Sequence, residues 1–174
     1  MKKIILAIFC IFMTTVYAFA EGEAWESITK GWSRMPIRVY LDDTGKYTAQ
    51  IKEGFNEWEE KSDKKVRFTF VTKPHSGYAS ITVKVVEQFS DETAGLTSAQ
   101  MGVNKIYKSS IDIGTHSLDG KPFSDKELDI IIRHEIGHAL GLKHTQDVKS
   151  IMFPYIFVGQ SITDNDLNDL FELY

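Results

Sequence analysis

The sequence has 174 residues, of which 43% are hydrophobic and 25% are charged, and its formal net charge is -4. This length favours a single domain, and this composition excludes an intrinsically disordered chain. The acidic balance, without any basic run, gives no basis for expecting a nucleic-acid partner.

The first 20 residues have the pattern of a secretory signal peptide. A short basic start precedes an apolar run from Ile4 to Tyr17, and Ala18-Phe19-Ala20 has the small-x-small form of a cleavage site. A membrane anchor is the alternative, but the run is short for a span and lacks a positive flank after it. A lipid anchor on Cys10 is disfavoured because the bulky Phe9 precedes it. We therefore expect residues 1–20 to direct export to the periplasm or the medium, and residues 21–174 to form a domain that does not contact the membrane after cleavage.

The central part of the chain predicts strands around one amphipathic helix. Alternating or continuous apolar residues indicate strands over 37–41, 66–71, 80–86 and 105–113, with a shorter one over 94–98. Ile51, Phe55 and Trp58 have the i, i+4, i+7 spacing of one helix face, which predicts a helix over 47–61.

Capping patterns predict two more helices. Ser124 and Glu127 form a capping box before a helix over 125–140, and Gly141 suits a left-handed helix end. Thr163 and Asp166 cap a closing helix. The apolar residues expected to bury its inner face are Leu167, Leu170 and Phe171. The order of elements predicts an α+β fold, similar to α/β, with a mixed sheet.

The informative stretch is HEIGHALGLKH, residues 134–144. His134 and His138 are four residues apart on a predicted helix, so both imidazoles lie on one face. Glu135 follows the first of them, so its carboxylate lies near a metal held by the two histidines. Gly141 permits a sharp turn that returns His144 as a third ligand.

Three histidines would leave one position open on a tetrahedral zinc, as catalytic zinc sites require. Glu135 would take a proton from the attacking water and pass it to the leaving amine. A single His-x-x-x-His pair also arises by chance on surface helices. Here, however, three of the chain's five histidines share one eleven-residue pattern with the glutamate and the glycine, so we predict one catalytic zinc ion (Zn2+) in a peptide-bond hydrolase.

This stretch matches the long zinc signature His-Glu-x-x-His-x-x-Gly-x-x-His, and the chain resembles the metzincins, in particular the matrixin branch. The resemblance implies a twisted mixed sheet with two long helices and a small C-terminal helical subdomain. It also implies that residues 32–41 correspond to the first strand of the matrixins. It also implies a Met-turn at Met152 beneath the zinc, and an aspartate, Asp166, that ties the last helix to that turn. Other implied positions are the S1′ pocket at Pro154 and Tyr155, although Tyr155 is equally compatible with a core aromatic, and the substrate-binding edge strand at Gly95 and Leu96.

The resemblance also bears on ions, control and partners. Matrixins often carry calcium and a second zinc, but the sequence around His75 lacks the histidine-aspartate cluster that would hold them, so we do not expect these ions. The mature segment has no cysteine to cap the zinc, which leaves export, substrate access or a protein inhibitor to control activity. We expect a monomer that acts on peptides or proteins.

Two other classes of function remain open on the sequence. One is a zinc-holding binding protein without peptidase activity, against which the retained Glu135 argues. The other is a host-directed factor that cleaves a single partner and little else.

Overall fold

The structure, a computed structural model, describes residues 30–72, 80–103 and 105–174. The predicted signal peptide and His75 lie outside these ranges. The strands are β1 (Lys30–Trp32), β2 (Ile37–Asp42), β3 (Phe68–Val71), β4 (Ile81–Val86), β5 (Gly95–Met101) and β6 (Lys105–Gly114). The helices are α1 (Thr48–Lys61), α2 (Asp125–Leu140) and α3 (Asp164–Leu173), with a 3-10 turn at Gly45–Tyr47.

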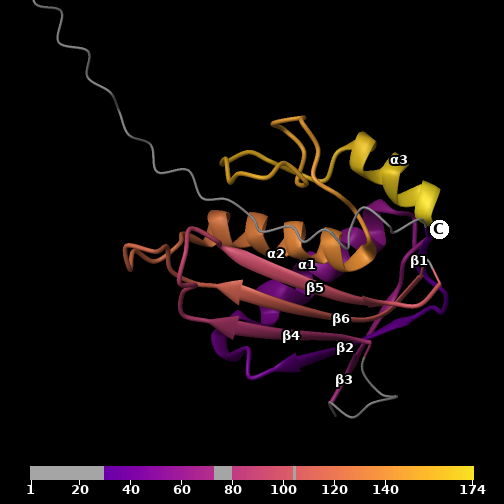
Figure 1. Cartoon of the computed structure of the whole chain (residues 1–174), viewed down its shortest axis with the longest axis horizontal. Coiled ribbons are helices and arrows are strands. Elements are labelled where there is room, and N and C mark those ends of the chain that lie inside the picture. Colours follow the sequence, from indigo (N-terminus) through magenta and orange to yellow (C-terminus); the bar gives the residue numbers. More distant parts are fainter. Residues whose placement is uncertain (1–29, 73–79, 104) are drawn as a thin grey trace, which may run out of the picture.

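The strands form one mixed sheet in the order β1-β6-β4-β2-β3, with β5 paired to β6 (Figure 1). Four of the pairings are parallel, and only β5 runs antiparallel to its neighbour. The predicted α+β architecture with a mixed sheet is therefore confirmed. In the described part of the sheet, β5 has no strand on its other side, so it is an edge strand.

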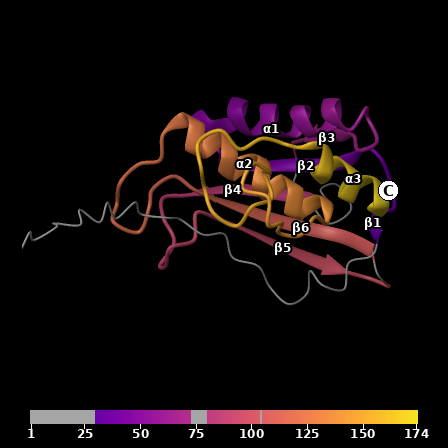
Figure 2. The same cartoon turned by 90° about the horizontal axis from the view of Figure 1, so that it is seen from above.

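Helices α1 and α2 cover the same face of the sheet and lie side by side (Figure 2). They approach closely at Gly54, where an added Cβ would lie 2.7 Å from Cγ2 of Ile132. Phe55 and Trp58, from the predicted apolar stripe, are completely buried, and the Trp58 indole donates a hydrogen bond of 2.9 Å to the Arg133 carbonyl. This contact holds α2 against α1.

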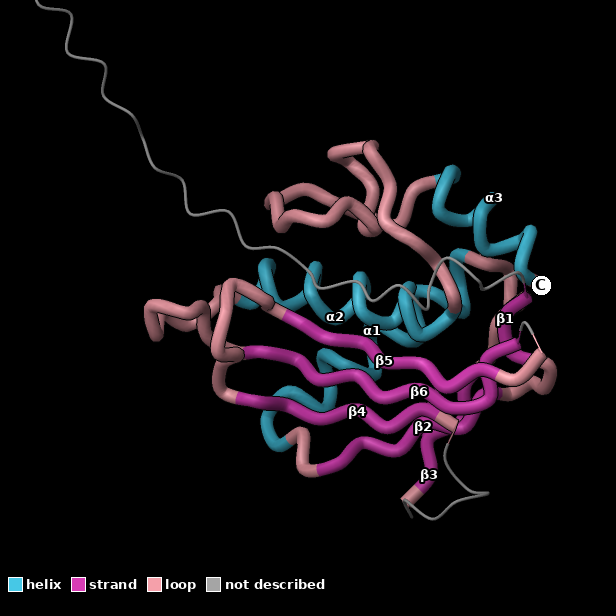
Figure 3. The backbone as a smooth tube through the Cα atoms, viewed as in Figure 1, coloured by secondary structure: helices cyan, strands magenta, loops and turns pink. Residues whose placement is uncertain are grey.

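The start and end of α2 follow the predicted capping pattern. The Ser124 hydroxyl accepts from the Glu127 backbone N–H at 3.4 Å, and the Glu127 carboxylate accepts from the Ser124 backbone N–H at 2.8 Å. At the other end, Gly141 has φ +104°, the left-handed region that a residue with a Cβ rarely adopts. The chain then leaves the helix as an irregular segment that leads to α3 (Figure 3).

Two aromatic side chains satisfy carbonyl groups at the end of α2. A helix leaves its last carbonyls without intrahelical partners. The Trp32 indole donates to the Ala139 carbonyl at 2.8 Å, and the Tyr174 hydroxyl donates to the Leu140 carbonyl at 3.0 Å. Tyr174 packs where a side chain on Gly31 would stand. The end of α2 is thus held by residues from opposite ends of the described chain.

Three sequence-based expectations differ from the structure. The single first strand that the resemblance to matrixins implies over 32–41 is divided between two strands. Trp32 ends β1, which pairs with β6, whereas β2 begins at Ile37 and lies between β3 and β4. The edge strand β5 runs three residues further than expected, to Met101, because it pairs with β6 along that length. Phe171 was predicted to be buried and is 44% exposed. It directly follows the fully buried Leu170, about 100° further round the helix, and so faces away from the core.

Replacing Tyr174 by phenylalanine should lower the free energy of unfolding by about 1–2 kcal/mol, because it leaves a helix-end carbonyl without its donor. Equilibrium denaturation measures the change. Tyr107→Phe, on an exposed tyrosine of β6, is the matched control and should change stability little. Equal effects of the two variants would contradict the role given to the Tyr174 hydroxyl.

Candidate metal centre and active site

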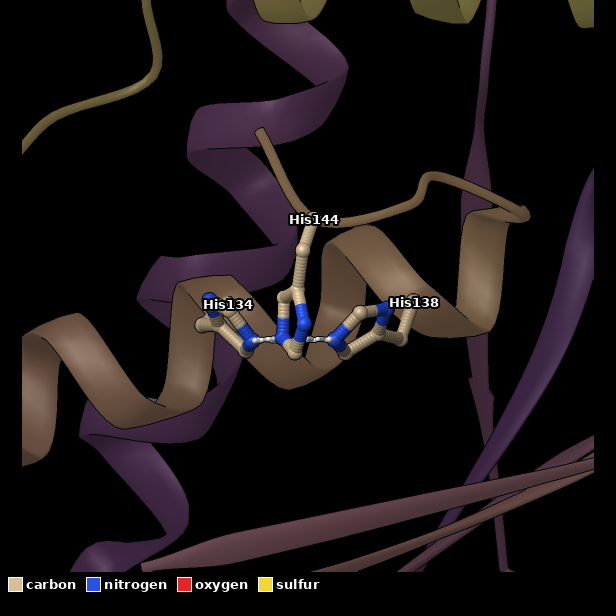
Figure 4. Close-up of side chains that lie close together, drawn as sticks. All are labelled: His134, His138 and His144. Atoms are coloured by element: carbon tan, nitrogen blue, oxygen red, sulfur yellow. Dashed lines mark hydrogen bonds between the residues drawn. The ribbon is translucent and has the colours of Figure 1, made fainter. Parts of the chain in front are cut away.

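Three imidazole rings meet above the last turns of α2 (Figure 4). His134 and His138 project from the same face of the helix, and His144 returns to them from the segment after Gly141. The Nε2 atoms are separated by 2.9 Å for His134 and His138, 3.1 Å for His134 and His144, and 3.2 Å for His138 and His144. The two helical histidines are completely buried, and His144 is half-buried.

Backbone carbonyls orient the two buried rings. Nδ1 of His134 lies 2.7 Å from the Ile151 carbonyl, and Nδ1 of His138 lies 2.9 Å from the Leu142 carbonyl. A carbonyl only accepts hydrogen bonds, so each Nδ1 carries the proton and each Nε2 presents a lone pair toward the cluster. Metal-binding histidines in proteins are commonly oriented in this way.

The cluster fits a zinc ion. Tetrahedral zinc with Zn–N bonds of about 2.0–2.1 Å places its nitrogen ligands about 3.3 Å apart, close to the spacings among these three atoms. Burial is the main cause that lowers the pKa of His134 well below 6.5 and that of His138 to about 3, with smaller contributions from the neighbouring histidines. The imidazoles of His134 and His138 are therefore neutral at physiological pH, as metal binding requires. Three nitrogen ligands with one open position are the donor set of a catalytic zinc.

Glu135 lies beside the histidines with its carboxylate almost completely buried. Its Oε2 accepts a hydrogen bond of 2.6 Å from the Thr97 hydroxyl, whereas its buried Oε1 has no hydrogen-bond partner among the described residues. Burial raises the pKa of Glu135 to about 8, the Thr97 hydrogen bond lowers it, and the charge of Asp112 adds a smaller increase. A buried carboxylate with one unsatisfied oxygen is chemically suited to accepting a proton from water.

The edge strand β5 brings two of its residues to this carboxylate. Gly95, which the sequence placed on the substrate side, lies directly against Glu135. Thr97, two residues further on, is buried on the same face of the strand. Leu96 lies between them, half-buried, and pairs with Asp112 of β6. Sequence reasoning missed Thr97, because only the register of β5 against α2 reveals its contact with Glu135.

The Met-turn region packs beneath the histidines. Met152 is buried, and its sulfur occupies the space beside Gly137, the residue directly before His138. The Ser150 hydroxyl donates to Asp166 and accepts from the Met152 backbone N–H at 2.8 Å. Asp166, which the resemblance implies is tied to the Met-turn, thus reaches the backbone of that turn through the Ser150 side chain, whose intermediate role sequence reasoning missed.

Pro154 and Tyr155 follow the Met-turn in the irregular segment before α3. Pro154 is half-buried, and Tyr155 is 41% exposed, which excludes a core position for this tyrosine. The Tyr155 ring lies 5.8 Å from that of Phe153. Gln160 fixes this loop, because its amide donates to the Tyr155 carbonyl and accepts from the Phe157 N–H.

Among the residues that the structure describes, the three histidines are the only group of three or more metal-ligating side chains close enough to hold an ion. His116 does not belong to it, and its Nδ1 lies 2.9 Å from the Thr115 hydroxyl. No helix in the described ranges is long and apolar enough to cross a membrane.

Known proteins share the fold and part of the sequence. Interstitial collagenase of Sus scrofa is 36% identical over 56 residues, which make up 31% of this chain and 12% of that protein. The chain thus matches only about an eighth of that relative's length. The crystal structure of archaemetzincin from Methanopyrus kandleri superposes with a TM-score of 0.50 at 12% identity, covering 79% of this chain and 95% of that one. This likeness confirms the metzincin fold.

The family model of the matrixins matches residues 39–174. This range contains α2, the three histidines and the Met-turn, as well as most of the sheet. The match confirms the resemblance seen in the sequence and, with the histidine cluster, supports zinc as the cofactor. The chain therefore belongs to the matrixin family of zinc metallopeptidases.

Proposed function

We propose that this chain is a secreted zinc-dependent endopeptidase in which Glu135 is the general base. The observation that carries the proposal is the meeting of three Nε2 atoms within 3.2 Å of one another beside a buried carboxylate. Peptide hydrolysis requires a group that makes water nucleophilic and a group that moves the proton of that water. The three histidines supply a binding site for a metal ion that does the first, and the Glu135 carboxylate does the second.

Each residue has a distinct task in the proposed reaction. His134, His138 and His144 hold the zinc through Nε2. When bound, zinc supplies Lewis acidity, which makes water a nucleophile near neutral pH and polarises a carbonyl oxygen. Glu135 accepts a proton from the attacking water and returns it to the leaving amine nitrogen. Burial, which raises the pKa of Glu135 to about 8, suits a group that must take up and release a proton near neutral pH.

The edge of the sheet supports an extended peptide or protein as the substrate. β5 pairs only with β6 in the described sheet, and its Gly95 and Thr97 contact Glu135. A peptide that adds to this edge as another strand would pass beside the base. Pro154 and Tyr155 are then candidates to contact the side chain after the scissile bond, with Met152 and Asp166 as structural support.

Export rests on the N-terminal pattern of residues 1–20, which the sequence alone provides. The proposal includes a monomer whose activity is controlled by export, substrate access or a protein inhibitor. The alternative is a host-directed or zinc-holding protein with one selective target, and turnover of a general substrate distinguishes the two.

The direct test is cleavage of casein by residues 21–174 with and without a zinc chelator. The chelator should abolish cleavage and added zinc should restore it. Glu135→Gln, which keeps the shape of the side chain but not its basicity, should lower kcat by about 10²- to 10⁴-fold. Zinc bound by the parent without any cleavage of casein would favour the selective or non-catalytic alternative.

The metal site makes a separate prediction about binding. His134→Ala should remove tight zinc binding, because two imidazoles remain where the proposed site needs three. His116→Ala, which changes a histidine outside the cluster, is the matched control and should keep one zinc per chain. Metal analysis after dialysis against zinc measures both. Retained stoichiometric zinc in His134→Ala would contradict the assignment of this ligand.

The stability of the metal-free protein should be greatest near pH 6.5. Below that pH the unfolded chain protonates its histidines, whereas the folded pKa values of His134 and His138 are depressed, so the unfolded state binds more protons and stability falls toward pH 3. Between pH 4.5 and 8 the raised pKa of Glu135 acts oppositely, because the folded state binds the proton. Below pH 6.5 the two histidines take up more protons on unfolding than the one glutamate releases, so stability rises with pH. Above pH 6.5 the proton released by the glutamate dominates, so stability falls.

Denaturation of the metal-free chain across pH 4–8 measures this profile. Glu135→Gln should lack the decline between pH 6.5 and 8, because glutamine does not titrate. A decline of equal size in that variant would show that another group causes it.

A further inference from the structure

Two residues of the edge strand enclose the carboxylate of Glu135. Gly95 and Thr97 are two positions apart on β5, so both face the same side of the sheet, toward α2. Both are buried, and β5 packs directly on α2. Glu135 extends from the helix into the space between them.

Gly95 supplies the room for the carboxylate. A Cβ at this position would lie 2.5 Å from Oε1 of Glu135, 2.7 Å from Cγ and 2.8 Å from Cδ. Heavy atoms do not approach so closely, so any other side chain would displace the Glu135 side chain. The glycine is therefore required by the position of the carboxylate, since no turn or unusual backbone angle is present in the strand at this point.

Thr97 supplies the hydrogen bond. Its Oγ1 lies 2.6 Å from Oε2 of Glu135 and 3.0 Å from the backbone carbonyl of the same residue. That carbonyl lies inside α2, where the helical i to i+4 hydrogen bond already uses it as an acceptor. A threonine hydroxyl has a single proton to donate, and the shorter contact directs it to the carboxylate.

The two carboxylate oxygens are thereby made unequal. Oε2 has a partner, whereas Oε1 is buried without one among the described residues. Without the hydroxyl, neither oxygen would have a side-chain partner in the described residues, and the terminal torsion of the side chain, which is intrinsically broad, would no longer be fixed at one angle.

We infer that Thr97 is a positioning residue, whose hydroxyl holds Oε2 of Glu135 and leaves Oε1 as the oxygen that exchanges the proton with water and the leaving amine. The inference rests on the proposed function. It adds that the base is fixed from two sides, by α2 through its backbone and by β5 through Thr97. Since an extended substrate would pair with β5, base and substrate would be aligned by the same strand.

Thr97→Val and Thr97→Ser separate the hydroxyl from the packing. Valine keeps the shape and removes the donor, so kcat for a casein-derived peptide should fall by about 10- to 100-fold, while KM and zinc stoichiometry stay unchanged. Serine keeps the donor and should recover most of kcat. Thr115→Val, which removes the hydroxyl of another buried threonine with carbonyl partners, is the matched control and should leave kcat unchanged.

A merely structural role for Thr97 would give a different pattern. Thr97→Val would then lower the melting temperature as Thr115→Val does, and kcat per folded, zinc-loaded chain would equal that of the parent. The same kcat in Thr97→Val and the parent, or failure of Thr97→Ser to restore a lost kcat, would overturn the inference.

A second measurement does not depend on activity. In the metal-free protein, the melting-temperature shifts of Thr97→Val and Glu135→Ala should not add in the double variant, because both remove the same hydrogen bond. Additive shifts would overturn the inference whatever the activity. If the shifts are non-additive but the chain cleaves no peptide, the hydrogen bond between Thr97 and Glu135 is supported and the proposed function is overturned.

Discussion

The reversal of the chain at Gly141 is the constraint on which the site depends. His134 and His138 share a helix face by sequence spacing alone, but the third imidazole has to come from a segment that runs back over the helix. The positive φ of Gly141 makes this return possible. Trp32 and Tyr174 hold the two carbonyls before the turn, and the Leu142 carbonyl just after it orients His138. One helix end therefore fixes both the path of the chain and the tautomer of a ligand.

Burying this many polar groups requires that they be satisfied from outside the helix. The Ile151 carbonyl serves His134, and the Ser150 and Asp166 pair holds the turn that presents this carbonyl. On the opposite side, Thr97 serves one oxygen of Glu135. Oε1 of Glu135 is buried without a hydrogen-bond partner among the described residues, and the Nε2 atoms of the three histidines face one another. The fold thus satisfies the polar atoms that orient the site and brings the Nε2 atoms and the Glu135 carboxylate together.

Much of this arrangement could be predicted from the sequence, because it depends on local sequence patterns. The capping boxes at Ser124 and Thr163, the stripe of Ile51, Phe55 and Trp58, and the spacing of the histidines depend on residues close together in the chain. Thr97 could not be predicted, since its contact depends on how β5 lies against α2, 38 residues away. The same holds for Tyr174 and the Leu140 carbonyl. The burial of Phe171 was predicted wrongly because Leu170 and Phe171 are adjacent apolar residues, and only Leu170 lies on the buried face of the helix.

The central claim is that three imidazoles, and no other protein group, hold one zinc ion. X-ray absorption at the zinc edge of the loaded protein tests it most directly, because scattering from imidazole rings reports their number. The account predicts three imidazole nitrogens at about 2.0–2.1 Å and one position not filled by the protein. A site with two imidazoles, or one closed by a fourth protein ligand, would contradict it.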